Sequence, residues 1–185
     1  MMSSCVAFLR AINVGGTKPI SMESLRDLCA NVGLVRAKTL LNSGNVVFNT
    51  KGRSTARLEH LLQSEAAKRL SLETDFFVRS GQEMSQIISG NPFQHEADND
   101  PAHLVVMFLK NKPTPKMVQE LNEAIPGRET VRVRGREAFV VYPDGIGNSR
   151  LSVKLIEKCL STPGTGRNWN TILRIAEMLR ELSDT

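Results

Sequence analysis

Two short segments of the sequence combine glycine with amide and basic side chains, a set of groups that can bind an anion. Residues 10–18 follow one apolar run, and residues 42–45 separate two more. Backbone N–H groups at glycine-rich turns, together with the positive end of a following helix, attract phosphate and carboxylate groups. The candidate ligand-binding residues here are Arg10, Asn13, Gly15, Gly16, Lys18, Asn42, Ser43, Gly44 and Asn45. The alternative is that these are only turns, which use glycine and asparagine because they need positive φ angles.

Further candidates lie in the C-terminal half, and they complete a predicted cleft between the two halves. They are Asp144, Arg150, Arg167, Asn168 and Asn170. We expect Ser149 to cap a helix with Arg150 in its first turn, where a cation is unfavourable unless an anion binds there. If Arg150 were exposed to solvent, the electrostatic cost of that placement would also be small.

Trp169 stands among arginine and asparagine residues and allows two interpretations. The indole could stack on a base or sugar while the neighbouring amides select its edge. Its spacing to Ile172 and Ala176 favours packing in the core instead, with Asn168 or Asn170 capping the last helix.

A basic stripe raises the question of nucleic-acid binding. In an extended strand, Arg132, Arg134 and Arg136 would share one face, and such stripes neutralise phosphates or protect an exposed strand from aggregation. Residues 1–92 hold 11 Lys and Arg against 7 Asp and Glu, and residues 93–185 hold 13 against 12, so the stripe lies in the nearly neutral half. Aromatic residues make up only 5% of the chain. Nucleic acid therefore has weaker support than a small anion.

The sequence lacks the motifs of several common classes of enzyme and metal site. The sequence has no GxSxG, HExxH or Walker loop, and the ligand-rich stretch 95–103 has no zinc spacing, so we expect no metal and no cofactor. The odd, widely spaced Cys5, Cys29 and Cys159 are typical of buried free thiols in a reducing compartment. Without a signal or an apolar span, we expect a cytoplasmic protein with no membrane partner.

Hydrophobic periodicity predicts an α+β fold of two closely packed ferredoxin-like halves. The first half reads as strand, helix, strand, strand, helix and strand, at residues 4–13, 21–32, 35–41, 45–49, 54–70 and 75–79. The pattern restarts with strands at 104–109, 129–134 and 137–142, and with helices at 114–125, 149–160 and 169–182. The last strand that this fold requires is missing or very short, around residues 165–168. The predicted domains are residues 1–80, a connection at 81–102, and residues 103–185 with an extra C-terminal helix. In this fold the antiparallel sheets carry helices on one face, and the first and third strands are adjacent, which would bring residues 10–18 beside 42–45.

The same segments resemble the signature segments of a bacterial family, the domain-of-unknown-function family 1697. They are Phe8–Gly16, Asn42–Phe48, Asn91–Phe93, Tyr142–Gly145 and Arg167–Thr171, in the right order along nearly the whole chain. The resemblance implies a cytosolic protein of two plait-like halves and implies no activity. Ala11, Gly166, Leu40 and Leu41 depart from residues that are usual in the family.

These observations favour binding of a small phosphate-bearing or other anionic ligand, nucleotide-like, in a polar Asn/Gly/Arg cleft. One alternative is a small hydrolase of the acylphosphatase type, since acylphosphatases share the plait and hold phosphate at the loop after the first strand. Another is a protein-interaction module in which the polar segments only form turns. Fold analogy alone cannot choose among these functions.

Overall fold

The computed structural model describes residues 2–10, 20–40 and 44–183. The chain divides into two compact units, a first unit of Met1–Gln86 with Arg174–Thr185 and a second unit of Ile87–Leu173. The boundaries fall inside helices α3 (Gly81–Ser89) and α7 (Trp169–Ser183), so each of these helices contributes residues to both units.

The first unit contains one antiparallel sheet in the order β2-β3-β1-β4. Its strands are β1 (Met2–Leu9), β2 (Val35–Leu40), β3 (Asn45–Lys51) and β4 (Phe76–Ser80), and its helices are α1 (Met22–Asn31) and α2 (Thr55–Leu70). The predicted neighbourhood of the first and third strands is confirmed, because β1 pairs with β3 from Met2 opposite Lys51 to Phe8 opposite Asn45.

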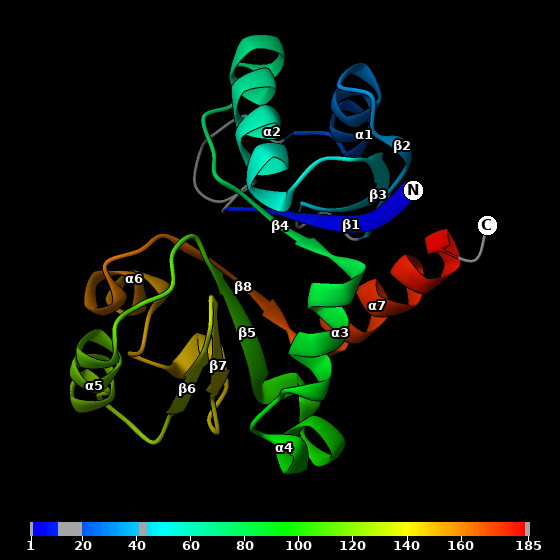
Figure 1. The fold of residues 1–185 in the computed structure, drawn as a ribbon. Helices are drawn as coiled ribbons and strands as arrows, with labels where there is room; N and C mark the ends of the chain where they lie inside the picture. The colour runs from blue at the N-terminus through cyan, green and yellow to red at the C-terminus, as the bar shows by residue number, and fades with distance from the viewer. Residues whose placement is uncertain (1, 11–19, 41–43, 184–185) are drawn as a thin grey trace. The chain divides into compact units, whose positions relative to one another are not determined.

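Helices α1 and α2 cover one face of this sheet (Figure 1). Their apolar side chains, such as Leu25 and Leu58, pack with Ala7 and Leu9 of β1 in one buried cluster. The helices begin where the sequence predicts, since Ser21 and Ser54 accept hydrogen bonds from the backbone N–H groups of Ser24 and Arg57.

The second unit repeats the arrangement with the order β6-β7-β5-β8. Its strands are β5 (Leu104–Leu109), β6 (Thr130–Arg134), β7 (Glu137–Val141) and β8 (Gly164–Asn168), and its helices are α4 (Gln94–Asn99), α5 (Pro115–Ala124) and α6 (Val153–Leu160). Helices α5 and α6 cover one sheet face (Figure 1), and the short 3₁₀ helices are η1 (Pro101–His103) and η2 (Ile146–Asn148). The α+β class with two four-stranded antiparallel sheets and a C-terminal helix is thereby confirmed.

Two local predictions about arginines are wrong. Helix α6 begins at Val153 with Ser152 as its cap, so Ser149 is not the cap and Arg150 does not lie in the first turn. Arg136 lies in the turn between β6 and β7, so only Arg132 and Arg134 share the exposed face of β6. In the part of the chain described, no helix is long and apolar enough to cross a membrane.

Candidate functional site

The end of β1 lies between the beginning of β3 and the beginning of β4. The backbone N–H of Leu9 donates to the Gly44 carbonyl at 2.9 Å, and the N–H of Arg10 donates to the Asp75 carbonyl at 3.0 Å. Strands β3 and β4 therefore place the residues directly before them, Gly44 and Asp75, on either side of Leu9 and Arg10. We call the described residues Arg10, Gly44, Asn45 and Asp75 the Arg10 corner.

The Arg10 side chain is 38% exposed and has an acidic neighbour that the sequence analysis missed. Its Nη1 lies 3.4 Å from Asp75 Oδ2, while Gln63 of α2 donates to Asp75 Oδ1 at 3.4 Å. The Thr74 hydroxyl donates to the Arg10 carbonyl at 2.7 Å. Asp75, which directly precedes β4 and is itself contacted from α2, therefore holds the guanidinium, while more than a third of the Arg10 side chain remains exposed to solvent.

Asn45 has a different environment from Arg10. Its side chain is fully buried, and its Nδ2 donates to the Leu40 carbonyl at 3.0 Å, which ties the end of β2 to the beginning of β3. Asn13, Gly15, Gly16, Lys18, Asn42 and Ser43 lie outside the described residues, and their predicted roles stay predictions.

The same corner exists in the second unit with different residues. The N–H of Leu109 donates to the Arg136 carbonyl at 2.8 Å, and the N–H of Lys110 donates to the Pro163 carbonyl at 3.1 Å. Glu137 lies opposite Phe108, as Asn45 lies opposite Phe8. We call Lys110, Arg136, Glu137 and Pro163 the Lys110 corner.

The connections at the two corners differ in length. Residues 10–21 join β1 to α1, whereas residues 110–114 join β5 to α5. Residues 41–44 join β2 to β3, whereas residues 135 and 136 alone join β6 to β7. The second unit therefore forms the same strand order with short connections, whereas the first unit has longer connections at the Arg10 corner.

The predicted residues of the loop before α6 bind other protein groups. Asp144 is paired with Arg128, whose pKa is raised by hydrogen bonding to that carboxylate and by its charge. The exposed Arg150 donates from Nη2 to the Pro126 carbonyl at 3.0 Å. Ser149, in place of capping a helix, donates to Glu129 and accepts from the Leu151 N–H.

The predicted residues around Trp169 mostly stabilise the end of β8 and the beginning of α7. Trp169 is 3% exposed, which confirms core packing, and Asn168 Oδ1 caps α7 by accepting from the Asn170 N–H at 3.0 Å. Arg167 is 8% exposed and donates at 2.8 Å to both Thr165 Oγ1 and the Gly166 carbonyl. Burial lowers the pKa of Arg167 to about 10.

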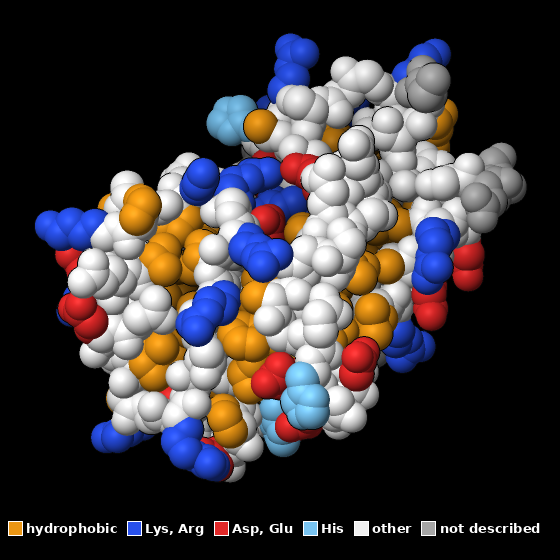
Figure 2. Space-filling model, turned by 60° about the horizontal axis from the view of Figure 1, so that its bottom comes forward, with side chains coloured by type: hydrophobic (Ala, Val, Ile, Leu, Met, Phe, Trp, Pro, Cys, Tyr) orange, Lys and Arg blue, Asp and Glu red, His pale blue; other side chains and the backbone are white. Residues whose placement is uncertain are grey.

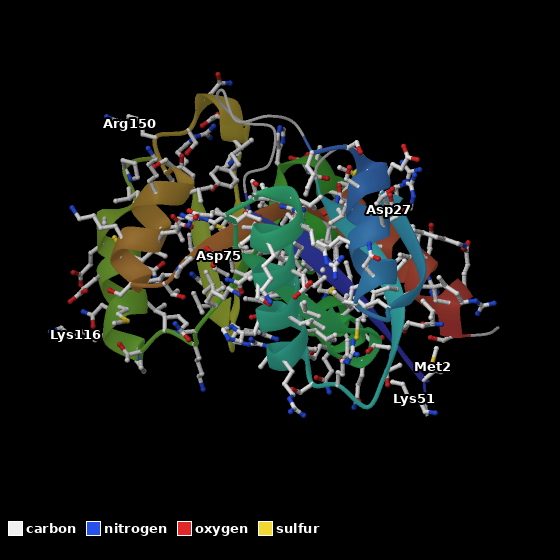
Figure 3. All side chains as sticks on the ribbon, turned by 90° about the horizontal axis from the view of Figure 1, so that it is seen from above. Met2, Asp27, Lys51, Asp75, Lys116 and Arg150 are labelled. Atoms are coloured by element: carbon white, nitrogen blue, oxygen red, sulfur yellow. The ribbon has the colours of Figure 1, made fainter. Side chains whose placement is uncertain are left out.

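The structure thus brings together Arg10, Gly44 and Asn45 from the predicted set. The pairing of β1 with β4 adds Asp75 and Thr74 to that group, and α2 adds Gln63. The signal for Asp75 was its position directly before β4, opposite the end of β1, although only the strand register shows that it faces Arg10. Figure 3 marks Asp75 in the first unit and Arg150 in the second.

The predictions on metal binding and on the basic surface concern groups outside the Arg10 corner. Among the described residues, no three His, Cys, Asp or Glu side chains are grouped as a metal site would need. His103 Nδ1 lies 2.7 Å from Asp100 Oδ2 in the ligand-rich stretch 95–103. Figure 2 shows a face on which only some of the Lys and Arg side chains have Asp or Glu side chains beside them, and nucleic-acid binding stays a prediction.

A comparison with protein-family models matches residues 2–139 to DUF1697, a family described as proteins of unknown function. The chain belongs to the DUF1697 family. The match spans the first unit's sheet and helices and continues into β7. Membership agrees with the resemblance drawn from the sequence segments and assigns no activity.

Two further proteins are similar to this DUF1697 chain. The conserved bacterial protein SP0830 from Streptococcus pneumoniae has a solved structure that matches with a TM-score of 0.77 and 22% identity, covering 97% of this chain and 99% of that one. This likeness supports the fold. The mouse (Mus musculus) intermembrane lipid transfer protein VPS13A is 21% identical over 179 residues, 95% of this chain, which spans only 4% of the length of that protein.

Proposed function

We propose that this DUF1697 protein binds a small anionic ligand, phosphate-bearing and nucleotide-like, at the Arg10 corner. The observation that carries the proposal is the contrast between two corners of the same topology. Residues 10–21 and 41–44 are longer connections than the fold requires in the second unit, and they adjoin a partly exposed arginine. Extra chain at strand ends is where proteins commonly place binding residues, because a rigid sheet positions the loop that carries them.

Arg10 has the chemistry to be the anchor of this site. A guanidinium carries five N–H donors in a planar fork, which matches the oxygens of a phosphate or carboxylate. Its ion pair with Asp75 is long, at 3.4 Å, and partly exposed on both sides, so it contributes no more than about 1 kcal/mol. An anion that meets the fork with better geometry can therefore bind beside Asp75 without an excessive loss.

The remaining candidates extend the proposal from the corner into its loops. Asn13, Gly15, Gly16, Lys18, Asn42 and Ser43 would supply backbone N–H groups, amides and a further cation. Asp144, Arg150, Arg167, Asn168 and Asn170 stay predictions, and the proposal does not depend on them.

We place this binding in the cytoplasm of a bacterial cell. Cys5, Cys29 and Cys159 are free, which agrees with a reducing compartment. Burial raises the pKa of the Cys29 thiol to about 12, and of Cys5 to about 11 with a smaller contribution from the Glu83 charge, so both stay protonated and unreactive.

Calorimetric titration of the full chain with AMP and with inorganic phosphate tests the proposal. Arg10→Ala should weaken AMP binding by about tenfold or more, as expected for a lost charge-assisted pair. Lys110→Ala is the matched control, because it removes one positive charge from the equivalent position and should leave the affinity unchanged. Equal effects of both variants, or no heat of binding with either probe, would contradict the proposal.

A further inference from the structure

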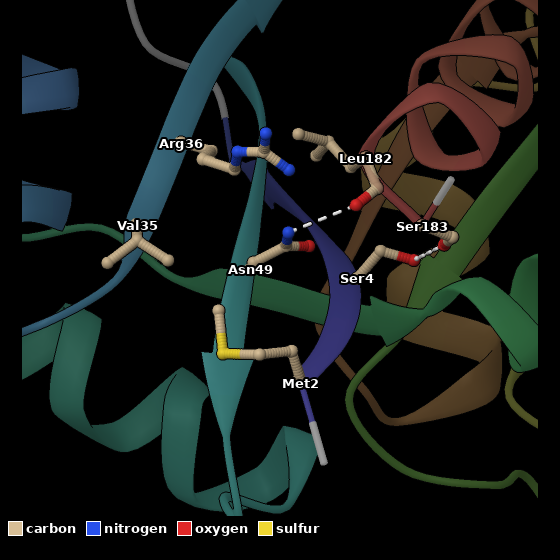
Figure 4. A pocket seen from close by; sticks show the side chains of 7 residues that line it. All are labelled: Met2, Ser4, Val35, Arg36, Asn49, Leu182 and Ser183. Carbon is tan, nitrogen blue, oxygen red and sulfur yellow. Dashed lines mark hydrogen bonds between the residues drawn. The ribbon is translucent and has the colours of Figure 1, made fainter. Parts of the chain in front are cut away.

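A cavity of about 470 Å³ lies at the other end of the first sheet from the Arg10 corner. Its lining comes from the beginning of β1, the beginning of β2, the end of β3 and the end of α7, all within the first unit (Figure 4). Met2 and Lys51, which are paired at this end of the sheet, are labelled in Figure 3 together with Asp75 at the other end. The cavity is thus separate from the site proposed above.

Arg36 lines this cavity in a backbone conformation that an arginine rarely adopts. Its φ angle is 59°, in the left-handed region, and the pairing of β2 with β3 shifts register between Val35 and Lys38. In the second sheet, β6 pairs with β7 without such a shift, from Thr130 opposite Val141 to Arg134 opposite Glu137. The first unit therefore holds an extra, strained residue at this place, and bulges of this kind redirect a side chain.

The guanidinium of Arg36 is available for an anion. Arg36 is exposed, and within the described residues no carboxylate or hydrogen-bond acceptor pairs with its side chain. Figure 4 shows the guanidinium extending over Asn49 toward Leu182. The redirected side chain thus presents its donors to the cavity rather than to a partner among the described residues.

Two polar positions of the cavity wall are fixed by hydrogen bonds. Asn49 is 5% exposed and donates from Nδ2 to the Leu182 carbonyl at 3.1 Å. Ser183 donates to the Leu179 carbonyl, so in the 3.0 Å contact between the two hydroxyls Ser4 donates to Ser183. Ser4 and Asn49 lie opposite each other, whereas the equivalent pair in the second sheet is Leu104 and Val141, both apolar.

The rest of the wall is apolar and partly open. Met2 is 50% exposed and Val35 is 44% exposed, values that are high for large hydrophobic side chains, while Leu182 is buried. A ligand that covers Met2 and Val35 would remove apolar surface from water, which is favourable. The cavity therefore combines a cation that has no partner among the described residues, a polar wall fixed by hydrogen bonds and an uncovered apolar side.

We infer that this cavity binds a small carboxylate with an apolar body, about the size of an arylacetate. The carboxylate pairs with the Arg36 fork, and the apolar body covers Met2 and Val35. The inference does not rest on the function proposed for the Arg10 corner, because no residue is shared between the two sites.

NMR titration of the ¹⁵N-labelled full chain with phenylacetate tests this inference, with acetate, 2-phenylethylammonium and inorganic phosphate as comparison probes. Acetate has the charge without the apolar body, and 2-phenylethylammonium has the body with the opposite charge. We expect phenylacetate to shift the Arg36 and Asn49 side-chain resonances at concentrations below about 10 mM, acetate to bind about tenfold more weakly, and the ammonium to leave them unmoved. Binding of the ammonium as tightly as phenylacetate, or tighter binding of inorganic phosphate, would overturn the assigned ligand class.

Arg36→Gly separates a ligand role from a structural one. Glycine accepts a φ of 59° without strain, so this variant should melt at the same or a higher temperature while losing phenylacetate affinity by about tenfold or more. Arg36→Lys keeps the charge without the fork and should lose less, and Arg57→Ala, an exposed charge on α2, should lose nothing. Unchanged affinity in Arg36→Gly, or a lower melting temperature, would overturn the inference, and Arg10→Ala should not affect this site.

Discussion

The Arg10 corner and the Lys110 corner occupy the same place in two copies of one strand order, and their backbone hydrogen bonds correspond one to one. At the Lys110 corner the neighbouring connections are residues 110–114 and 135–136, and the residue in the place of Asp75 is Pro163. At the Arg10 corner the connections are longer, and an ion pair replaces the proline. The topology is thus satisfied without the added features, which is why we attribute them to binding.

In both units, a helix glutamate accepts a hydrogen bond from a backbone N–H of the fourth strand. Glu59 of α2 accepts from Val78 at 2.9 Å, and Glu157 of α6 accepts from Gly164 at 2.8 Å. Glu59 differs in lying 3.6 Å from the buried Nη1 of Arg79, with side-chain exposures of 9% and 1%. The first unit therefore relies on a buried charge pair where the second has a partly buried carboxylate.

The largest loss of stability that we predict comes from removing the helix glutamate of the first unit. Glu59→Ala removes the carboxylate that lies 3.6 Å from the buried Arg79 guanidinium and should lower the free energy of unfolding by about 3 kcal/mol or more. Glu157→Ala should cost only about 1 kcal/mol, the typical net contribution of one hydrogen bond. Denaturant unfolding measures both losses, and equal losses would contradict the difference between the units.

Alkaline pH should destabilise the protein through the buried thiols of the first unit. Burial raises the pKa of Cys29 from 9.0 to about 12, so the unfolded chain releases this proton at a pH where the folded chain retains it. The resulting stability is fully present below about pH 9 and is lost as pH rises toward the folded pKa. At about pH 10.5 the loss from Cys29 should be about 2 kcal/mol.

Unfolding curves of Cys29→Ala between about pH 8 and pH 10.5 check this prediction. The variant should start less stable, because it removes buried atoms, and should then lose less with rising pH than the wild type. A pH dependence that does not change on substitution would show that the thiol of Cys29 titrates alike in both states.

Asn45→Ala should reduce stability moderately. The substitution leaves the Leu40 carbonyl without its buried donor, and we expect a loss of about 1–2 kcal/mol. Glu137→Ala is the matched change in the second unit and should cost less, because Glu137 is only half-buried. Thermal unfolding of both variants measures this, and a loss in AMP affinity without a loss in stability would instead indicate direct contact between Asn45 and the ligand.

The smallest effect is expected from Asp75→Asn. This change removes one negative charge beside Arg10 while retaining a group that Gln63 can contact, so AMP should bind about threefold more tightly. Calorimetric titration measures the change. Weaker binding would mean that the Asp75 carboxylate positions the guanidinium and does not merely compete with the ligand.

Sequence patterns predicted most of the architecture because local signals and the fold agreed. Alternating and helical apolar spacing placed the strands and helices, and the serine or threonine caps at Ser21, Ser54 and Thr114 marked where helices begin. The prediction at Ser149 was wrong because two serines precede the same apolar run. Ser149 bonds to Glu129, a contact between residues 20 positions apart, and Ser152 takes the cap.

The candidate site was predictable only in part. Adjacency of β1 and β3 followed from the fold, so Arg10 and Gly44 could be placed together. The pairing of Arg10 with Asp75 depends on the register of β4, and the left-handed conformation of Arg36 depends on a bulge, neither of which has a local signal. The burial of Asn45 could not be predicted from the sequence either, because an asparagine beside a glycine is equally typical of an exposed turn.

A ¹⁵N NMR titration of the full chain with AMP, which follows both corners in one spectrum, tests directly whether the Arg10 corner binds the anion and the Lys110 corner does not. We expect concentration-dependent shifts of the Arg10, Gly44 and Asn45 amides, with the Lys110, Arg136 and Glu137 amides unmoved at the same concentrations. Equal shifts at both corners would indicate unspecific attraction to surface charge. Shifts confined to the second unit would contradict anion binding at the Arg10 corner.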